Sequence, residues 1–233
     1  MPTLQVIITG TTMTTHTETV LRLLAWLSPA FPTGAFAYSH GLEWAIESGD
    51  ISDETTLSNW LVDALVHGGG RSETILLRHA RRTEDAATLA RLCEVGAAIA
   101  TCRERLMETL AQGAAFARAA AAWGGGRLTA LSGHDLPYPV AVGALAADHQ
   151  IDEDATAAAY LQAMAANLIS AAVRLVPLGQ TAGLRVLVAL EPTLLAVAAE
   201  ARGATLDDLG GCCFRSDIAA MRHETQHTRL FRT

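Results

Sequence analysis

The most informative absence in this sequence is lysine, since all 17 basic residues are arginine. A Walker-type phosphate loop needs a lysine, and so does Schiff-base catalysis. The two Gly-Gly-Gly-Arg runs at 68–71 and 124–127 are therefore not phosphate loops of that kind. Glycine runs usually interrupt helices, so we expect both to be flexible connections between them.

Cysteine is scarce, and its spacing excludes common sites. The chain has four cysteines and no Cys-x-x-Cys pair, which disfavours a disulfide framework and predicts a reducing, cytoplasmic location. The net charge of −7 disfavours nucleic acid as a partner. Residues 155–173 lack charge but are mostly alanine with several polar side chains, so we expect no membrane span. Residues 1–17 are threonine-rich, lack the features of a signal peptide, and are expected to form a flexible leader.

Aromatic residues are also few, at 5%, whereas half of the chain is hydrophobic and rich in alanine and leucine. This composition favours helices, and no segment alternates apolar and polar residues long enough to predict a sheet. Between 57 and 65 the apolar residues share one helical face, and Ser52 or Asp53 can cap that helix. Pro177 and Pro192 stand where helices are expected to start. We therefore predict a single-domain, all-α bundle of about ten helices over 18–211, at about 18–28, 38–48, 57–65, 72–82, 85–100, 102–122, 138–149, 155–173, 179–190 and 192–202.

The end of the chain, residues 212–233, differs in charge from the rest. From Arg215 onward it carries four arginines against Asp217 and Glu224, a net charge of +2, which leaves −9 for the remainder. Such a basic tail on an acidic body is a candidate for docking onto an acidic partner. We expect an amphipathic helix over 216–229 with apolar anchors such as Ile218 and Met221.

The tail also contains His223-Glu224-Thr225-Gln226-His227, which has the His-Glu-x-x-His pattern of zinc metallopeptidases. A catalytic zinc needs three protein ligands, and none of the six residues after His227 is a good third one. The peptidase hypothesis is therefore disfavoured, and we expect no metal site. His223 stays a weak candidate for transient nickel contact, because imidazole suits that metal.

Three stretches together resemble a known family. These are "SPAFPTGAFAYSHGLE" at 28–43, "PLGQTAGLRVL" at 177–187 and "DIAAMRHETQHTRLFRT" at 217–233. In this order they resemble the signatures of urease accessory protein F. The sequence departs from the family at His227, where tyrosine is usual, and at Ala182 and Leu184, which replace more polar residues.

The resemblance implies an all-helical, non-enzymatic, homodimeric helper in urease maturation. Such proteins bridge a scaffold, urease accessory protein D (called H in some systems), and the GTPase accessory protein G. The complex inserts nickel into apo-urease in a GTP-dependent step, so no cofactor is expected to bind this chain tightly. A generic helical adaptor unrelated to nickel remains the alternative.

The resemblance also suggests site residues. Tyr38, Gln180 and Arg222 match the tyrosine, glutamine and arginine of the three signatures. The alternative for Tyr38, Gly41 and Glu43 is that they organise the core around a buried loop, and for Gln180 that it is a core amide. The expected partner-binding residues are Tyr38, Gly41, Glu43, Gln180, Arg222, His223, Glu224 and Arg229.

Overall fold

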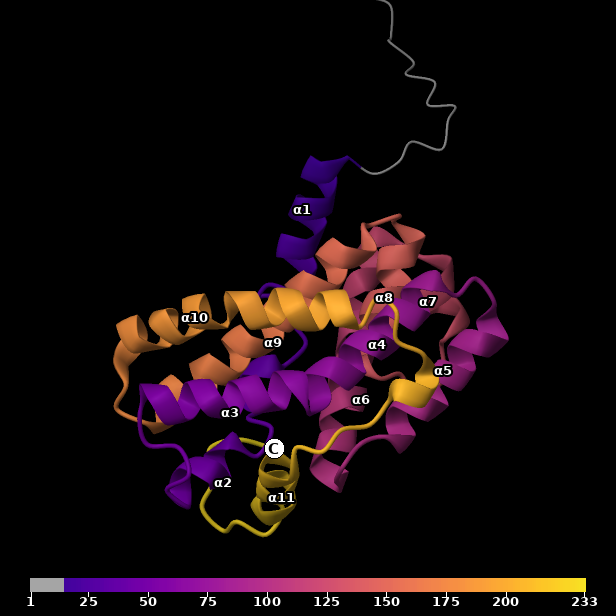
Figure 1. The fold of residues 1–233 in the computed structure, drawn as a ribbon. Coiled ribbons are helices and arrows are strands. Elements are labelled where there is room, and N and C mark those ends of the chain that lie inside the picture. Colours follow the sequence, from indigo (N-terminus) through magenta and orange to yellow (C-terminus); the bar gives the residue numbers. More distant parts are fainter. Residues whose placement is uncertain (1–14) are drawn as a thin grey trace, which may run out of the picture.

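The computed structural model describes residues 15–233, so most of the leader expected over residues 1–17 lies outside the described residues. The described part is helical without any strand, which confirms the all-α class (Figure 1). Its helices are α1 (His16–Trp26), η1 (Ala35–Ala37), α2 (Leu42–Glu47), α3 (Glu54–Val66), α4 (Gly69–Arg82), α5 (Ala86–Ala98), α6 (Arg103–Ala120), η2 (Ala121–Trp123), α7 (Gly126–Ala130), α8 (Tyr138–Asp148), α9 (Glu153–Leu175), α10 (Gly179–Glu200), η3 (Leu206–Asp208) and α11 (Phe214–His223).

Local sequence fixes where several helices begin. Asp53 caps α3 as expected, because its carboxylate accepts a hydrogen bond from the backbone N–H of Thr56 at 2.8 Å. Asp85 and Asp152 cap α5 and α9 in the same way. These caps satisfy backbone donors that the first turn of a helix leaves without partners, which explains why the predicted starts agree closely with the observed ones.

The expectation of separate helices at 179–190 and 192–202 is wrong, because α10 continues through Pro192. Proline removes one backbone donor, and its ring crowds the carbonyl four residues earlier, here that of Val188. Both residues lie on the exposed side of α10, where water can hydrate that carbonyl. The helix therefore tolerates the proline instead of ending at it.

The first glycine run is a tight junction and not a loose connection. α3 ends at Val66, and α4 begins at Gly69. Gly70 is buried, and a Cβ atom there would lie 2.7 Å from the Cα of Leu65. Glycine thus allows the two helices to follow each other in close contact. The second run connects η2 to α7, whose first residue is Gly126.

Two apolar clusters form the core. α8 is the centre of one, since nine of its eleven residues are buried. It packs closely on α4, where Gly143 faces the carbonyl of Leu77. The second cluster lies between α2, α3, α9, α10 and α11. α1 and α11 lie at opposite ends of the molecule in Figure 1.

Candidate docking surface

The C-terminal segment differs from the expected helix over 216–229, because α11 ends at His223. The remaining residues turn back and pair with the loop before α2. The backbone N–H of Arg232 donates to the carbonyl of Ala37 at 2.8 Å, and the N–H of Ser39 donates to the backbone oxygen of Thr233 at 2.9 Å. Residues 224–233, which we call the tail strap, are thus bound to the body of the protein.

Glu43 is the main anchor of the tail strap. It is 6% exposed, and its carboxylate accepts hydrogen bonds from the backbone N–H groups of Leu230 and Phe231 at 2.7 and 2.9 Å. One of its oxygens also lies 3.2 Å from Nε2 of His223. A buried carboxylate with several donors is stable, whereas removing it would leave those donors without partners.

His223 is fully buried between two carboxylates. Its Nδ1 lies 2.7 Å from Glu104, and its other ring nitrogen faces Glu43. The expectation that His223 contacts a partner or nickel is therefore wrong for this conformation, because neither ring nitrogen is available. His227 lies beyond the end of α11 and is exposed, so the two histidines do not form the zinc-binding pair of a peptidase helix. Across residues 15–233, no cluster of three or more His, Cys, Asp or Glu side chains could hold a metal ion.

Glu224 and Arg229 attach the tail strap to the start of α6. The backbone N–H of Glu104 donates to the carboxylate of Glu224 at 3.2 Å. Nη1 of Arg229 lies 2.7 Å from Oε1 of Glu104. These two predicted partner-binding residues therefore make contacts inside the chain, although Arg229 keeps an exposed side.

The loop before α2 brings Tyr38 and Gly41 into the interior as well. Tyr38 is 4% exposed. Gly41 has φ +77°, and a Cβ atom there would lie 2.4 Å from the backbone nitrogen of Ala220 in α11. With Glu43, these residues match the alternative in which they organise a buried loop. They hold α11 and the tail strap in place.

Gln180 and Arg222 lie at the surface. Gln180 occupies the first turn of α10 and is exposed, so the core-amide alternative is wrong. Arg222 is exposed in the last turn of α11, and the structure gives it no ion pair with any residue of the described chain. Both side chains are available to a partner.

An apolar stripe covers the outer face of α11. Phe214, Ile218 and Met221, the α11 stripe, are 68%, 53% and 48% exposed. Their spacing of four and three residues places them on one face of the helix. Arg215 beside them pairs with Asp50 at 2.8 Å, whereas Arg222 is unpaired within residues 15–233. The sequence indicated Ile218 and Met221, but the predicted helix began too late to include Phe214.

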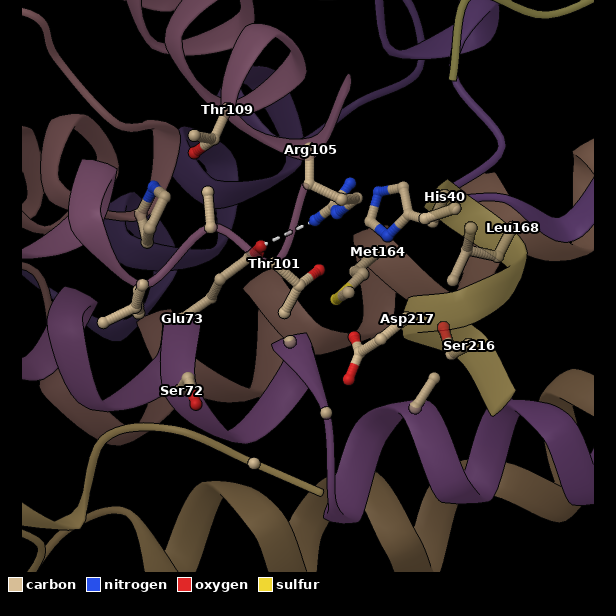
Figure 2. A pocket seen from close by; sticks show the side chains of 18 of the residues that line it. His40, Ser72, Glu73, Thr101, Arg105, Thr109, Met164, Leu168, Ser216 and Asp217 are labelled. Carbon is tan, nitrogen blue, oxygen red and sulfur yellow. Dashed lines mark hydrogen bonds and ion pairs between the residues drawn. The ribbon is translucent and has the colours of Figure 1, made fainter. Parts of the chain in front are cut away.

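A cavity of about 100 Å³ lies behind α11 and receives side chains from α4, α6 and α11 (Figure 2). Glu73 accepts hydrogen bonds from Arg105 at 2.9 Å and from the Tyr160 hydroxyl at 2.7 Å. Burial raises the pKa of Asp217, which also lines the cavity. Glu73 and Arg105 are paired with each other here, and with Tyr160 they join α4, α6 and α9.

Arg105 also binds Glu108, which connects this network to the tail strap. The carboxylate of Glu108 accepts a hydrogen bond from the Thr233 hydroxyl at 2.8 Å and lies close to His40. Burial alone would raise the pKa of Glu108, but Arg105, His40 and Thr233 outweigh it and hold the pKa at about 2. Glu108 is therefore ionised at neutral pH and fixes the last residue of the strap.

Comparisons with known proteins agree on one family. The family model described as UreF matches residues 51–191. The chain is 50% identical over 221 residues to "Urease accessory protein UreF" of Rhodopseudomonas palustris (strain TIE-1), covering 92% of each chain. It is 51% identical over 217 residues to the protein of that name from Cereibacter sphaeroides (strain KD131 / KCTC 12085), covering 92% of this chain and 98% of the relative. The Azorhizobium caulinodans protein of the same name is 49% identical over 220 residues.

Proposed function

Because the chain belongs to the UreF family of urease accessory proteins, we propose that it serves urease maturation by binding and not by catalysis. In this proposal it bridges the scaffold accessory protein D (or H) and the GTPase accessory protein G in the cytoplasm. The complex then delivers nickel to apo-urease in a GTP-dependent step. The chain itself acts as a homodimer within that complex.

The observation that supports this proposal best is the α11 stripe with Arg222 beside it. Exposed Phe214, Ile218 and Met221 form an apolar strip with an unpaired arginine at its edge. Protein interfaces are enriched in apolar side chains and arginine, and such residues carry much of the binding energy. The net positive charge after residue 214 favours an acidic surface on the partner. We assign this stripe to the D (or H) protein.

The buried contacts behind the stripe explain how it is presented. Gly41 allows α2 to pack against α11, while Glu43 and Glu104 hold His223 and the tail strap. A helix that is already ordered loses less conformational entropy when a partner binds. Tyr38, Glu43 and His223 would thus contribute to binding indirectly, through the position of α11.

Nickel is the cargo in this proposal and not a resident cofactor. His223 is engaged by two carboxylates, so it offers no free ligand atom in this conformation. The absence of lysine agrees with a nucleotide site on the G protein. Thus this chain would recruit and position its partners.

The test is binding to purified D protein by variants of the α11 stripe. We expect the double variant Phe214→Glu, Ile218→Glu to bind D at least about tenfold more weakly, because both changes put charge into a desolvated contact. Leu21→Glu on α1, where Leu21 is 63% exposed, is the matched control. Circular dichroism should show that all variants keep their helical content, since the altered side chains lie at the surface.

The same variants separate this proposal from a generic adaptor. In a strain that lacks its own F protein, the wild-type chain and Leu21→Glu should restore urease activity, whereas the stripe variant should not. Failure of the wild-type chain to restore activity would reject the urease role. Unchanged D binding by the folded stripe variant would reject the assignment of α11.

A further inference from the structure

A second cavity, of about 260 Å³, lies between α6, α9 and the loop that follows α1. Its volume approaches the lower end of small-molecule sites, about 300 Å³. Glu73 and Arg105, which are joined by a dashed line in Figure 2, line this cavity as well as the one behind α11. The exposed residues Phe36, Gln162 and Ser170 also line it, so it opens to solvent. We call it the α6–α9 cavity.

Two polar side chains that line the α6–α9 cavity keep an atom without a hydrogen-bond partner. The Tyr138 hydroxyl makes no hydrogen bond with any of residues 15–233. Burial and the nearby Glu73 raise its pKa, so this hydroxyl stays neutral and keeps its proton. Gln112 is 6% exposed and donates from Nε2 to Glu108 at 2.9 Å, but its Oε1 accepts nothing from the described chain. Polar atoms in such places normally have a partner, so both are available to a ligand.

The charged side chains of the cavity favour a cation. Arg105 donates to both Glu73 and Glu108, and His40 lies beside Glu108. Two carboxylates against one guanidinium leave a net negative charge when His40 is neutral. Each oxygen of Glu73 accepts one hydrogen bond, from Arg105 or from Tyr160, although a carboxylate has about four acceptor sites. A ligand that brings positive charge and several N–H donors matches these features.

A guanidinium group fits this description, because it is planar, carries five N–H donors and accepts no hydrogen bond. It also stacks on aromatic rings, and the rings of Tyr138 and Tyr160 lie with their centroids 5.4 Å apart on the cavity wall. Leu27 and Met164 supply apolar surface for an alkyl stem. Within residues 15–233 no cluster of His, Cys, Asp or Glu side chains could hold a metal ion, which favours an organic cation.

We propose that the α6–α9 cavity binds an alkylguanidinium group, with Tyr138, Gln112 and Glu73 as its hydrogen-bond partners. The group belongs either to a free small molecule or to an arginine side chain of a polypeptide. This site is separate from the α11 stripe, and the inference does not depend on the proposed function.

The primary test is isothermal titration calorimetry of the full chain with n-butylguanidinium. We expect a dissociation constant below about 1 mM, which is reasonable for so small a ligand. N-butylurea has nearly the same shape but is neutral and carries an acceptor oxygen. It should bind at least about tenfold more weakly, because hydrogen bonds between charged partners are roughly twice as strong as those between neutral ones.

Tyr138→Phe locates the ligand in the cavity. It removes only a hydroxyl that has no partner within residues 15–233, so the thermal unfolding midpoint should match wild type. Binding of n-butylguanidinium should weaken about tenfold, since one hydrogen bond to a charged group is lost. Tyr38→Phe is the matched control. Tyr38 is also buried and its hydroxyl also makes no hydrogen bond with the described residues, but it does not line the cavity. Its variant should bind as wild type does.

The peptide acetyl-Gly-Arg-Gly-amide separates the two sources of the group. Binding as tight as that of n-butylguanidinium would support the site and assign it to an arginine side chain, whereas binding of n-butylguanidinium alone would support the site and assign it to a free small molecule. Folded wild type that binds no n-butylguanidinium at about 10 mM would overturn the proposal. Equal binding of N-butylurea, or unchanged binding by Tyr138→Phe, would overturn it as well.

Discussion

Glu43 offers the most direct test of how the tail strap is held. Its carboxylate accepts hydrogen bonds from the backbone N–H groups of Leu230 and Phe231 and faces Nε2 of His223. Glu43→Gln keeps the size of the side chain but removes its charge and replaces one acceptor oxygen with a donor. At least one of these two backbone N–H groups, one buried and one part-buried, then loses its acceptor.

The expected cost can be worked out from those contacts. An unsatisfied buried donor costs about 1–3 kcal/mol, and hydrogen bonds to a charged group contribute about 1.5–3 kcal/mol each. We therefore expect the free energy of opening the tail strap to fall by about 2–4 kcal/mol in Glu43→Gln. Each 1.4 kcal/mol is a factor of ten, so exchange of the two amides should accelerate about 30- to 1000-fold.

Hydrogen–deuterium exchange with mass spectrometry measures this on peptides that cover residues 224–233. Glu84→Gln is the control, because Glu84 is exposed and lies at the surface before α5. Its exchange should match wild type. Unchanged protection of the tail strap in Glu43→Gln would refute the assignment of Glu43 as the anchor. Faster exchange across every helix would indicate global destabilisation instead.

Three further outcomes follow from the structure. Gly41→Ala should lower the free energy of unfolding, measured by urea denaturation, by at least about 2 kcal/mol. The new Cβ would clash with the backbone of α11, and alanine would also have to adopt a φ of +77°. Gly34→Ala is the control that isolates the clash, because Gly34 also has a positive φ but lies in open space. The depressed pKa of Glu108 means that its contribution to the free energy of unfolding is complete above pH 4.5 and is lost as pH falls towards about 2. Over that interval the free energy of unfolding of wild type should therefore fall by about 3 kcal/mol more than that of Glu108→Gln. Parallel pH profiles of the two proteins would contradict this. Pro192→Ala should raise the free energy of unfolding by about 1–3 kcal/mol, because alanine restores a backbone N–H donor inside α10. A lower free energy of unfolding in this variant would show that the proline stabilises α10.

The sequence predicted most helices because the signals for them are local. Apolar residues recur at the helical period, and caps such as Asp53 act on backbone groups three residues away. The sequence alone also excludes phosphate-loop and Schiff-base chemistry, because it has no lysine. The three family signatures can likewise be recognised without a structure. Arg222 and Gln180 were singled out from the signatures and are exposed in the structure, and their role in partner binding stays a prediction.

Only the tertiary structure decided the environment of the other candidate residues. His223 and Glu43 are 180 positions apart in the chain, and no local pattern indicates that they meet in the interior. α11 ends at His223, and the chain beyond it is not helical. There the backbone N–H groups of Leu230 and Phe231 donate to the buried carboxylate of Glu43 and not to carbonyls of a longer helix. Likewise, the continuation of α10 through Pro192 depends on which side of the helix faces water. Helical period and capping are set by neighbours in sequence, whereas burial and long-range ion pairs are set by the packing of all helices together.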